Sequence, residues 1–308
     1  EPAAAAVALD AAFAKAQNPR HRARLAWAAG MLPGQALSWI ARLASDSDEN
    51  LRMVAIRLCR RVEGDVLGLV EKLAADPVPA VRREGAIAVR GVVGERADRA
   101  WAELAAQHTA GDRWELEALG IGADGATGLA GESQWNSRLA AWRVKVGDGW
   151  KSPAGREIVW RSRADSTPQL LCEIIGDPAT STNESLACLR ALDFQAKGAV
   201  SEHVRPLVVS LPNDPEKTGV ILPELVLRLE PGDLAEPALR ARVIEAAHLV
   251  PGTATFYEIT RRFRLPEFLP GLVVMATLPG VDDGKAAEAV GLALEMQGEA
   301  AVGSLLAG

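Results

Sequence analysis

The chain of 308 residues is poor in the residue types that most often carry chemistry, with 3 cysteines, 4 histidines, 4 methionines and 1 tyrosine. It also lacks an excess of positive charge, because 34 Lys and Arg residues stand against 40 Asp and Glu residues. A net charge of −6 argues against a dedicated nucleic-acid binder, since neutralising phosphates requires surplus Lys and Arg. No stretch reaches the roughly 18 apolar residues that a membrane helix needs, so we expect no membrane insertion.

Motifs for cofactors and catalysis are missing as well. The chain contains no CxxC or CxxCH, no paired-histidine spacing, no Walker motif and no GxSxG. We therefore expect no haem, metal or nucleotide cofactor and no catalytic residue in this chain. The odd set Cys59, Cys172 and Cys188 makes a poor disulfide framework. We interpret them as small buried residues, although Cys172 and Cys188 would meet if their helices were neighbours.

One glycine pattern, Gly120-Ile-Gly-Ala-Asp-Gly125, satisfies GxGxxG. A dinucleotide site requires this loop between a strand and a helix, where the helix N-terminus meets the pyrophosphate. Here it follows a helical pattern with no βαβ unit around it. We interpret it as a helix C-cap and loop, with Gly120 or Gly122 at positive φ. Just upstream, Asp112 and Glu115 are typical of an N-cap and its N3 partner.

An internal repeat organises the first third of the chain. Leu43-Ala-Ser-Asp-Ser-Asp-Glu-Asn-Leu-Arg52 corresponds to Leu73-Ala-Ala-Asp-Pro-Val-Pro-Ala-Val-Arg82 at an offset of 30 residues. Each copy is an apolar helix end, a short turn containing Asp, and a second amphipathic helix. One such helix pair cannot bury its apolar stripe alone, but stacked pairs form a continuous core. A third, degenerate copy begins at Leu171.

Arg52 and Arg82 recur directly after the turn. We expect them to bond the Asp or a carbonyl of a neighbouring repeat and so form a ladder, while a ligand-binding row of arginines is the other interpretation. The rest of the chain reads as helices of about 10–14 residues, with no convincing alternating strand. The predicted fold is all-α, a HEAT-like α-solenoid of stacked antiparallel helix pairs.

The segment 109–163 is the least regular and carries a dense mixture of Trp and Arg. Trp135 and Trp142 are seven residues apart and would share one helical face, which is common in cores. The same mixture also suits a partner surface or a ligand pocket. Residues 1–163 hold 23 basic and 20 acidic side chains, and residues 164–308 hold 11 and 20. We therefore expect repeats over 1–110, an insert or connecting segment over 111–163, and degenerate repeats over 164–308.

Two resemblances follow from these residues. The copies at 43–58 and 73–88 resemble HEAT repeats. Gly111-Asp-Arg-Trp-Glu-Leu-Glu-Ala-Leu-Gly-Ile-Gly-Ala-Asp124, with Ser152-Pro-Ala-Gly-Arg156 and Trp160-Arg-Ser-Arg163, resembles the helical region of the PVC-type haem-binding, "membrane-bound dehydrogenase" family. That family joins a β-propeller, a HEAT-repeat region and a cytochrome c domain in one long exported chain. The resemblance implies a periplasmic or otherwise exported location and flanking domains as partners. Because propeller strands and CxxCH are missing here, it implies only the helical region.

Two hypotheses about function follow. The first is a non-catalytic scaffold or interaction module from a larger exported protein, either excised or processed, since the chain opens at Glu1 without Met. The second is a HEAT-like DNA glycosylase-type enzyme acting on damaged bases, which the Trp and Arg mixture favours and the negative net charge opposes. The candidate interaction surface consists of Arg113, Trp114, Arg156, Trp160 and Arg161. We expect Trp114 and Trp160 to anchor a domain interface and the arginines to pair with nearby carboxylates.

Overall fold

The computed structural model describes residues 2–125, 133–211, 214–277 and 280–307, and within these ranges it contains no β-strand. These ranges contain eighteen α-helices and several short 3-10 helices, and 76% of the described structure is helical. The prediction of an all-α fold is therefore confirmed. The chain divides into two compact units, Glu1–Asp165 and Ser166–Gly308, which we call unit 1 and unit 2.

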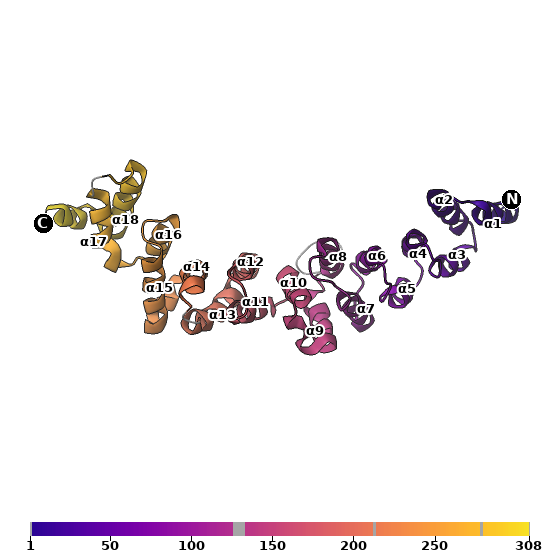
Figure 1. The fold of residues 1–308 in the computed structure, drawn as a ribbon, viewed down its shortest axis with the longest axis horizontal. Helices are drawn as coiled ribbons and strands as arrows, with labels where there is room; N and C mark the ends of the chain where they lie inside the picture. The colour runs from indigo at the N-terminus through magenta and orange to yellow at the C-terminus, as the bar shows by residue number, and fades with distance from the viewer. Residues whose placement is uncertain (1, 126–132, 212–213, 278–279, 308) are drawn as a thin grey trace. The chain divides into compact units, whose positions relative to one another are not determined.

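Unit 1 contains the first ten α-helices and a short 3-10 helix. They are α1 (Pro2–Lys15), α2 (Pro19–Gly30), α3 (Ala36–Leu43), α4 (Glu49–Arg61), α5 (Val66–Leu73), α6 (Pro79–Ala88), α7 (Glu95–Ala105), α8 (Arg113–Ala123), α9 (Trp135–Val146), η2 (Gly147–Lys151) and α10 (Pro153–Arg161). Consecutive helices pack on each other from α1 to α8, and α2, α4, α6 and α8 also pack in series. Figure 1 shows these even-numbered helices along one side of unit 1 and α3, α5, α7 and α9 along the other.

Unit 2 contains the remaining helices. They are α11 (Thr167–Gly176), α12 (Thr182–Leu192), α13 (Lys197–Ser210), α14 (Pro215–Val226), η3 (Pro231–Ala235), α15 (Pro237–Leu249), α16 (Ala254–Phe263), η4 (Pro266–Phe268), α17 (Leu269–Thr277) and α18 (Asp283–Ala307), the last broken at Gly298. Several helices again pack on the next but one, as in α11 with α13, α12 with α14 and α13 with α15. The segment 111–163, expected as an insert, folds as α8, α9, η2 and α10 within unit 1.

The helices begin where the chain supplies a cap or a proline. The side chains of Asn18, Asp48, Asp65 and Ser181 accept backbone N–H groups at the starts of α2, α4, α5 and α12. Such caps satisfy donors that have no partner within the helix. Proline occupies the first helical position of α2, α6, α10 and α15, where its missing N–H costs nothing. Local sequence alone therefore sets many of the helix starts.

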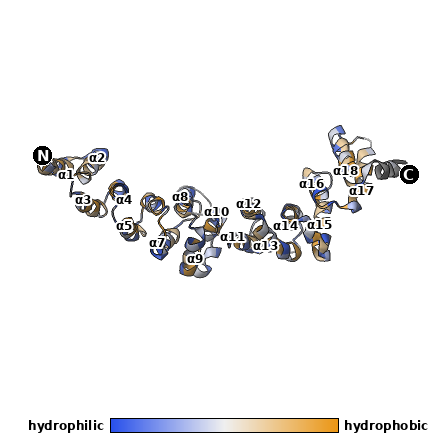
Figure 2. Cartoon of the chain, turned by 180° about the vertical axis from the view of Figure 1, so that it is seen from behind, coloured by the Kyte–Doolittle hydropathy of each residue, from blue (hydrophilic) through white to orange (hydrophobic). Residues whose placement is uncertain are grey.

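The core of unit 1 lies between its two layers of helices. Leu43, Leu51, Leu58 and Val81 are all fully buried, at the apolar positions of the 30-residue repeat. Figure 2 shows hydrophilic and hydrophobic residues on the same helices, as expected where one face is buried and the other meets water.

The predicted arginine ladder is present. Arg52 donates from Nε to Oδ2 of Asp76 at 2.6 Å and from Nη2 to Oδ1 at 2.9 Å, and from Nη1 to the carbonyl of Asp46 at 2.9 Å. Arg82 donates to the carbonyl of Asp76 at 2.8 Å and to Oε1 of Glu115 at 2.7 Å. Each arginine thus bonds its own turn and a carboxylate that belongs to the next turn or helix, which ties consecutive helix pairs together.

The ladder begins one helix pair earlier than the sequence pattern predicted. Arg22, which is 30 residues before Arg52, donates to Oδ2 of Asp46 at 3.0 Å. The repeated aspartates Asp46 and Asp76 are not the N-caps of the helices that follow, which are Asp48 and Val78. Each accepts the N–H of the residue two positions on, at 3.0 and 2.9 Å. This bond shapes the turn and fixes the carboxylate for the incoming arginine.

We expect Arg52→Ala to lower the free energy of unfolding by about 2 kcal/mol, because it removes a bidentate, charge-assisted contact to a buried carboxylate. Arg60→Ala on the same helix is the control, since Arg60 is exposed and surface changes of this kind stay within about 0.5 kcal/mol. Urea denaturation of both variants measures the difference. Equal midpoints for the two variants would show that the ladder adds nothing to stability.

Candidate functional site

The sequence-predicted site lies where α8 and α10 pack together in unit 1. Arg113 stacks over the ring of Trp160, with its guanidinium carbon 5.1 Å from the ring centroid, and forms an ion pair of 2.5 Å with Glu117. Trp114 points away from the core and is 77% exposed. Tryptophan and arginine are enriched at the centres of protein interfaces, so this face is an interaction candidate in unit 1. We call the surface of Arg113, Trp114 and Trp160 the α8–α10 face.

Arg161 belongs to the interior of this site rather than to its surface. It donates to Glu117 at 2.9 Å and to Asp124 at 3.3 Å, and its side chain is 16% exposed. It also lies 5.9 Å from the ring centroid of Trp135. Arg161 therefore joins α10 to the middle of α8 and to the residue that ends α8, as an internal strut. Arg156 is half-buried and donates from Nε to the carbonyl of Lys151 at 2.9 Å, which fixes the start of α10.

The expectation that Gly120 or Gly122 ends a helix at positive φ is wrong. Both lie inside α8, and neither has positive φ. A Cβ on Gly122 would lie 2.5 Å from the carbonyl oxygen of Ala86, and one on Gly120 would collide with the guanidinium of Arg161. These glycines are needed for close packing against α6 and α10, a tertiary requirement that the local pattern does not reveal.

Most of the aromatic density of the segment belongs to the core. Trp135, Trp142 and Trp150 are buried, in agreement with the shared helical face of the first two. Trp135 donates from Nε1 to Asp124 at 2.9 Å and packs edge-on against Trp101 at 5.7 Å. These rings cannot stack on a base or a sugar. The aromatic residues of this segment that reach the surface are therefore those of the α8–α10 face.

Arg138 is an arginine of this segment whose position, internal or at the surface, the sequence did not decide. The structure places its side chain in the interior. It is fully buried on α9 and donates from Nη2 to the carbonyls of Val89 and Val92 at 2.9 and 2.8 Å. Burial lowers the pKa of Arg138 to about 10, although Asp98 opposes this. The guanidinium caps the C-terminal end of α6, where unpaired carbonyls gather.

A buried chain of charged groups ends the arginine ladder. Asp112 caps α8 as predicted, accepting the N–H of Glu115 at 3.0 Å, but the Glu115 carboxylate turns inward to Arg82. Its other oxygen lies 3.6 Å from Nδ1 of His108, whose Nε2 is 2.8 Å from Oε2 of Glu157. Glu157 also accepts the N–H of Gly111 at 3.0 Å. This chain of contacts includes no Ser, Thr or Cys side chain. It joins the end of α7 to α8 and α10.

The charges of this cluster favour protonated histidine. Burial opposes the imidazolium, but the carboxylates of Glu115 and Glu157 outweigh it, so the pKa of His108 is raised above its ordinary value. For Glu115, burial raises the pKa, but His108 and Arg82 outweigh it and the pKa is lowered. His108 therefore contributes stability that is fully present below its unfolded pKa and is lost as pH rises through its folded pKa.

We expect the free energy of unfolding to fall as pH rises above about 6.5, the ordinary histidine pKa. In His108→Gln this part of the pH dependence should disappear, because the substituted side chain does not titrate. His21→Gln serves as the control, since His21 is exposed at the start of α2. Denaturant melts across this pH range test the prediction, and parallel pH curves for wild type and His108→Gln would contradict it.

A further prediction tests whether Arg161 is an internal strut or a surface residue. Arg161→Ala should lower the free energy of unfolding by about 1–2 kcal/mol, because the partly buried carboxylates of Glu117 and Asp124 each lose one charged partner. Gly120→Ala should be destabilising in the wild type, where the new methyl group meets Arg161, and neutral or stabilising in the Arg161→Ala background. Thermal melts of the two single variants and the double variant measure this coupling. Additive effects would show that Arg161 does not occupy the space beside Gly120.

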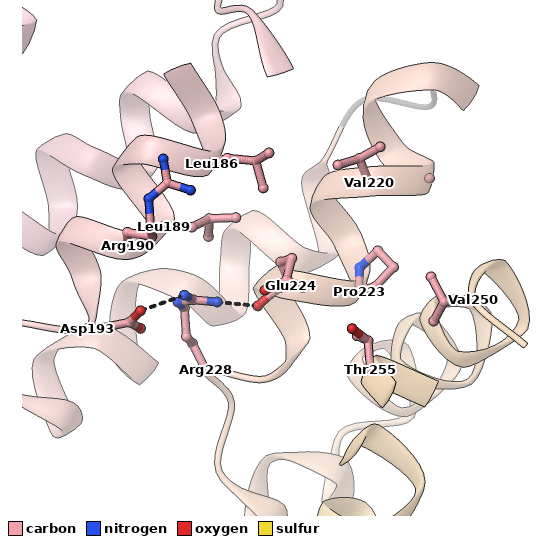
Figure 3. Close-up of a pocket in the computed structure, with 11 residues that line it drawn as sticks. Leu186, Leu189, Arg190, Asp193, Val220, Pro223, Glu224, Arg228, Val250 and Thr255 are labelled. Carbon is pink, nitrogen blue, oxygen red and sulfur yellow. Dashed lines mark hydrogen bonds and ion pairs between the residues drawn. The ribbon is translucent and has the colours of Figure 1, made fainter. Parts of the chain in front are cut away.

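Unit 2 contains an open groove of about 600 Å³ between α12 and α14. Leu186, Val220 and Pro223 line its apolar part, and Val250 and Thr255 close one end (Figure 3). At the opposite end Arg228 forms an ion pair with Asp193 at 2.9 Å and donates to the Glu224 carbonyl. The polar groups here serve mainly to join α12 to α14, and the groove combines no acid, base and nucleophile.

The described residues offer no further site of a familiar kind. In the ranges that the structure describes, no three or more His, Cys, Asp or Glu side chains are grouped so as to hold a metal ion. None of the helices described is both long and apolar enough to cross a bilayer. Comparison with protein-family models, with curated proteins and with solved structures finds no match to this chain.

Proposed function

We propose that this protein is a non-catalytic, HEAT-like α-solenoid that serves as a scaffold or interaction module, holding flanking domains of a larger chain or another protein in place. The α8–α10 face is its docking surface. The observation that carries the proposal is Trp114, a large apolar side chain that is 77% exposed beside a guanidinium already oriented by Trp160. Trp and Arg are the residues most enriched at the centres of protein interfaces.

The repeating contacts within each unit support the solenoid. Helices pack on the next and on the next but one, as expected where each repeat touches only its neighbours. The pairs Arg22–Asp46 and Arg52–Asp76 repeat the same link at an offset of 30 residues, and Arg82 continues the ladder with Glu115. A stack of repeats becomes longer with each repeat that is added. Such a stack suits a scaffold that holds other domains in position.

The resemblance of residues 111–124 and 152–163 to the PVC-type haem-binding family supports an exported, periplasmic scaffold attached to an oxidoreductase. Within the resembling segment, Asp112 caps α8 and Gly120 accommodates Arg161, so both have structural duties. Trp114, which is 77% exposed, is the residue of this segment that we expect to contact a partner. On this proposal any dehydrogenase or electron-transfer chemistry belongs to flanking domains and not to these residues.

The alternative of a base-acting, glycosylase-type enzyme receives less support from the same site. Such an enzyme needs exposed aromatic rings and an available acidic side chain, but Trp135, Trp142 and Trp150 are buried. The carboxylates of Glu115, Glu117 and Asp124 are held by Arg82, Arg113 and Arg161. The geometry of the α8–α10 face therefore favours docking over catalysis.

The test is Trp114→Ala, compared in the 308-residue chain and in the complete product of the native gene. We expect thermal stability of the 308-residue chain to change by less than about 0.5 kcal/mol, because the side chain is exposed. In the complete product, backbone amides of α8 and α10 should be protected from hydrogen exchange by the docked partner, and Trp114→Ala should release that protection.

Val144→Ala is the matched control, since Val144 is 88% exposed on α9 of the same unit. It should leave both stability and exchange unchanged. The docking proposal is wrong if α8 and α10 exchange equally in the short and complete proteins, or if Trp114→Ala unfolds the 308-residue chain.

A further inference from the structure

The helices α2, α4 and α6 of unit 1 differ in charge from α3, α5 and α7. The helices α2, α4 and α6 carry nine arginines, no lysine and two glutamates. The helices α3, α5 and α7 carry four basic and four acidic side chains. The surplus of positive charge on α2, α4 and α6 therefore comes from arginine alone. Arginine is the cation best suited to recognise carboxylates.

Some of these arginines are used internally, and some are not. Arg22, Arg52 and Arg82 form the ladder, and Arg57 pairs with Glu84 at 2.6 Å. By contrast, four exposed arginines form no hydrogen bond or ion pair through their side chains with any residue that the structure describes. These are Arg20 and Arg24 on α2, and Arg60 and Arg61 at the end of α4.

Exposed apolar side chains accompany these arginines. On α2, Trp27 is 36% exposed and Met31, which follows the helix, is 41% exposed. With Arg20 and Arg24 they recur at steps of three, four and seven residues, so they share one outward helical face. On α4, Arg57 precedes Arg60 by three residues and Arg61 by four. These three arginines therefore share the outward face near the end of the helix.

The two outward faces lie next to each other. The helices α2 and α4 pack together, and a Cβ on Gly30 would collide with the side chain of Leu58. The two helix ends that carry Trp27 and Arg61 are therefore adjacent. We name the surface of Arg20, Arg24, Trp27, Met31, Arg60 and Arg61 the α2–α4 patch.

We propose that the α2–α4 patch binds an acidic polypeptide segment that carries aromatic or other large apolar side chains. Four unpaired guanidinium groups supply charge complementarity for carboxylates, and Trp27 and Met31 supply an apolar contact between them. Packed helices stand about 8–10 Å apart. A chain in the polyproline II conformation rises about 3.1 Å per residue with three residues per turn, so it would present every third side chain to successive helices. This surface is separate from the α8–α10 face, so either proposal can fail alone.

The surrounding charges favour a polypeptide over a nucleic acid. Residues 1–163 hold 23 basic and 20 acidic side chains, a surplus too small for the broad positive surface that a long phosphate backbone needs. Further along the even side, Glu84 is held by Arg57 and Glu117 by Arg113. These carboxylates interrupt the positive surface beyond α4, and a continuous track for phosphates is lost. A short acidic segment needs only the α2–α4 patch.

The experiment measures binding of a labelled peptide of repeating Glu-Glu-Phe to the 308-residue protein by fluorescence anisotropy, at near-physiological ionic strength. Labelled peptides of repeating Gln-Gln-Phe and a single-stranded oligothymidylate are the comparison probes. The variants are Arg60→Glu with Arg61→Glu, and Trp27→Ala. The matched control reverses Arg99 and Lys145 to Glu on α7 and α9, where both pair with carboxylates on the odd side of unit 1.

We expect the acidic peptide to bind, the neutral peptide to bind far more weakly, and the reversal at Arg60 and Arg61 to weaken binding about tenfold or more. Trp27→Ala should weaken it as well, while the α7–α9 reversal and Trp114→Ala should leave it unchanged. Circular dichroism confirms that the variants are folded. The proposal is overturned if no peptide binds, if the α7–α9 reversal weakens binding equally, or if the oligothymidylate binds more tightly than the peptide.

Discussion

The pairing of an arginine with the turn carboxylate of the next helix pair is the interaction on which unit 1 depends. Arg52 reaches both oxygens of Asp76 and at the same time the carbonyl of its own turn at Asp46. The carboxylate is pre-oriented because it already accepts the N–H of Val78. Since the same residues recur every 30 positions, one local arrangement sets the spacing between successive helix pairs, and the apolar faces are then buried in register.

The ladder also explains how the arginines of the even-numbered helices divide into two groups. Those that face inward, such as Arg22 and Arg82, are used to join repeats. Of those that face outward on α2 and α4, Arg57 pairs with Glu84. The side chains of Arg20, Arg24, Arg60 and Arg61 have no carboxylate partner within the described structure and remain available to solvent or a partner. The ladder ends at Glu115 in place of an aspartate, where His108 and Glu157 continue the chain of charges. That end lies beside the α8–α10 face, so the rigid core and the proposed docking surface are continuous.

The α8–α10 face shows how one sequence feature separates into several structural roles. Of the five residues expected there, Arg113 and Trp160 stack on each other, Trp114 is exposed, and Arg161 is an internal strut. Spacing along a helix correctly indicated that Trp135 and Trp142 are buried together. It could not indicate that Arg161 would occupy the space beside Gly120, because that contact joins residues from two helices.

Periodicity, caps and the repeated turn were enough to determine the all-α fold, the helix starts at Asp48 and Asp112, and the ladder at Arg52 and Arg82. These features depend on residues within a few turns of one another, or on an exact repeat, and both are visible in a sequence. The role of Gly122, the burial of Arg138 and the clamp at His108 were decided only by tertiary structure. Each of them depends on contacts between segments that are far apart in the chain. Distance and burial in the folded structure, rather than residue type, decide which residues make those contacts.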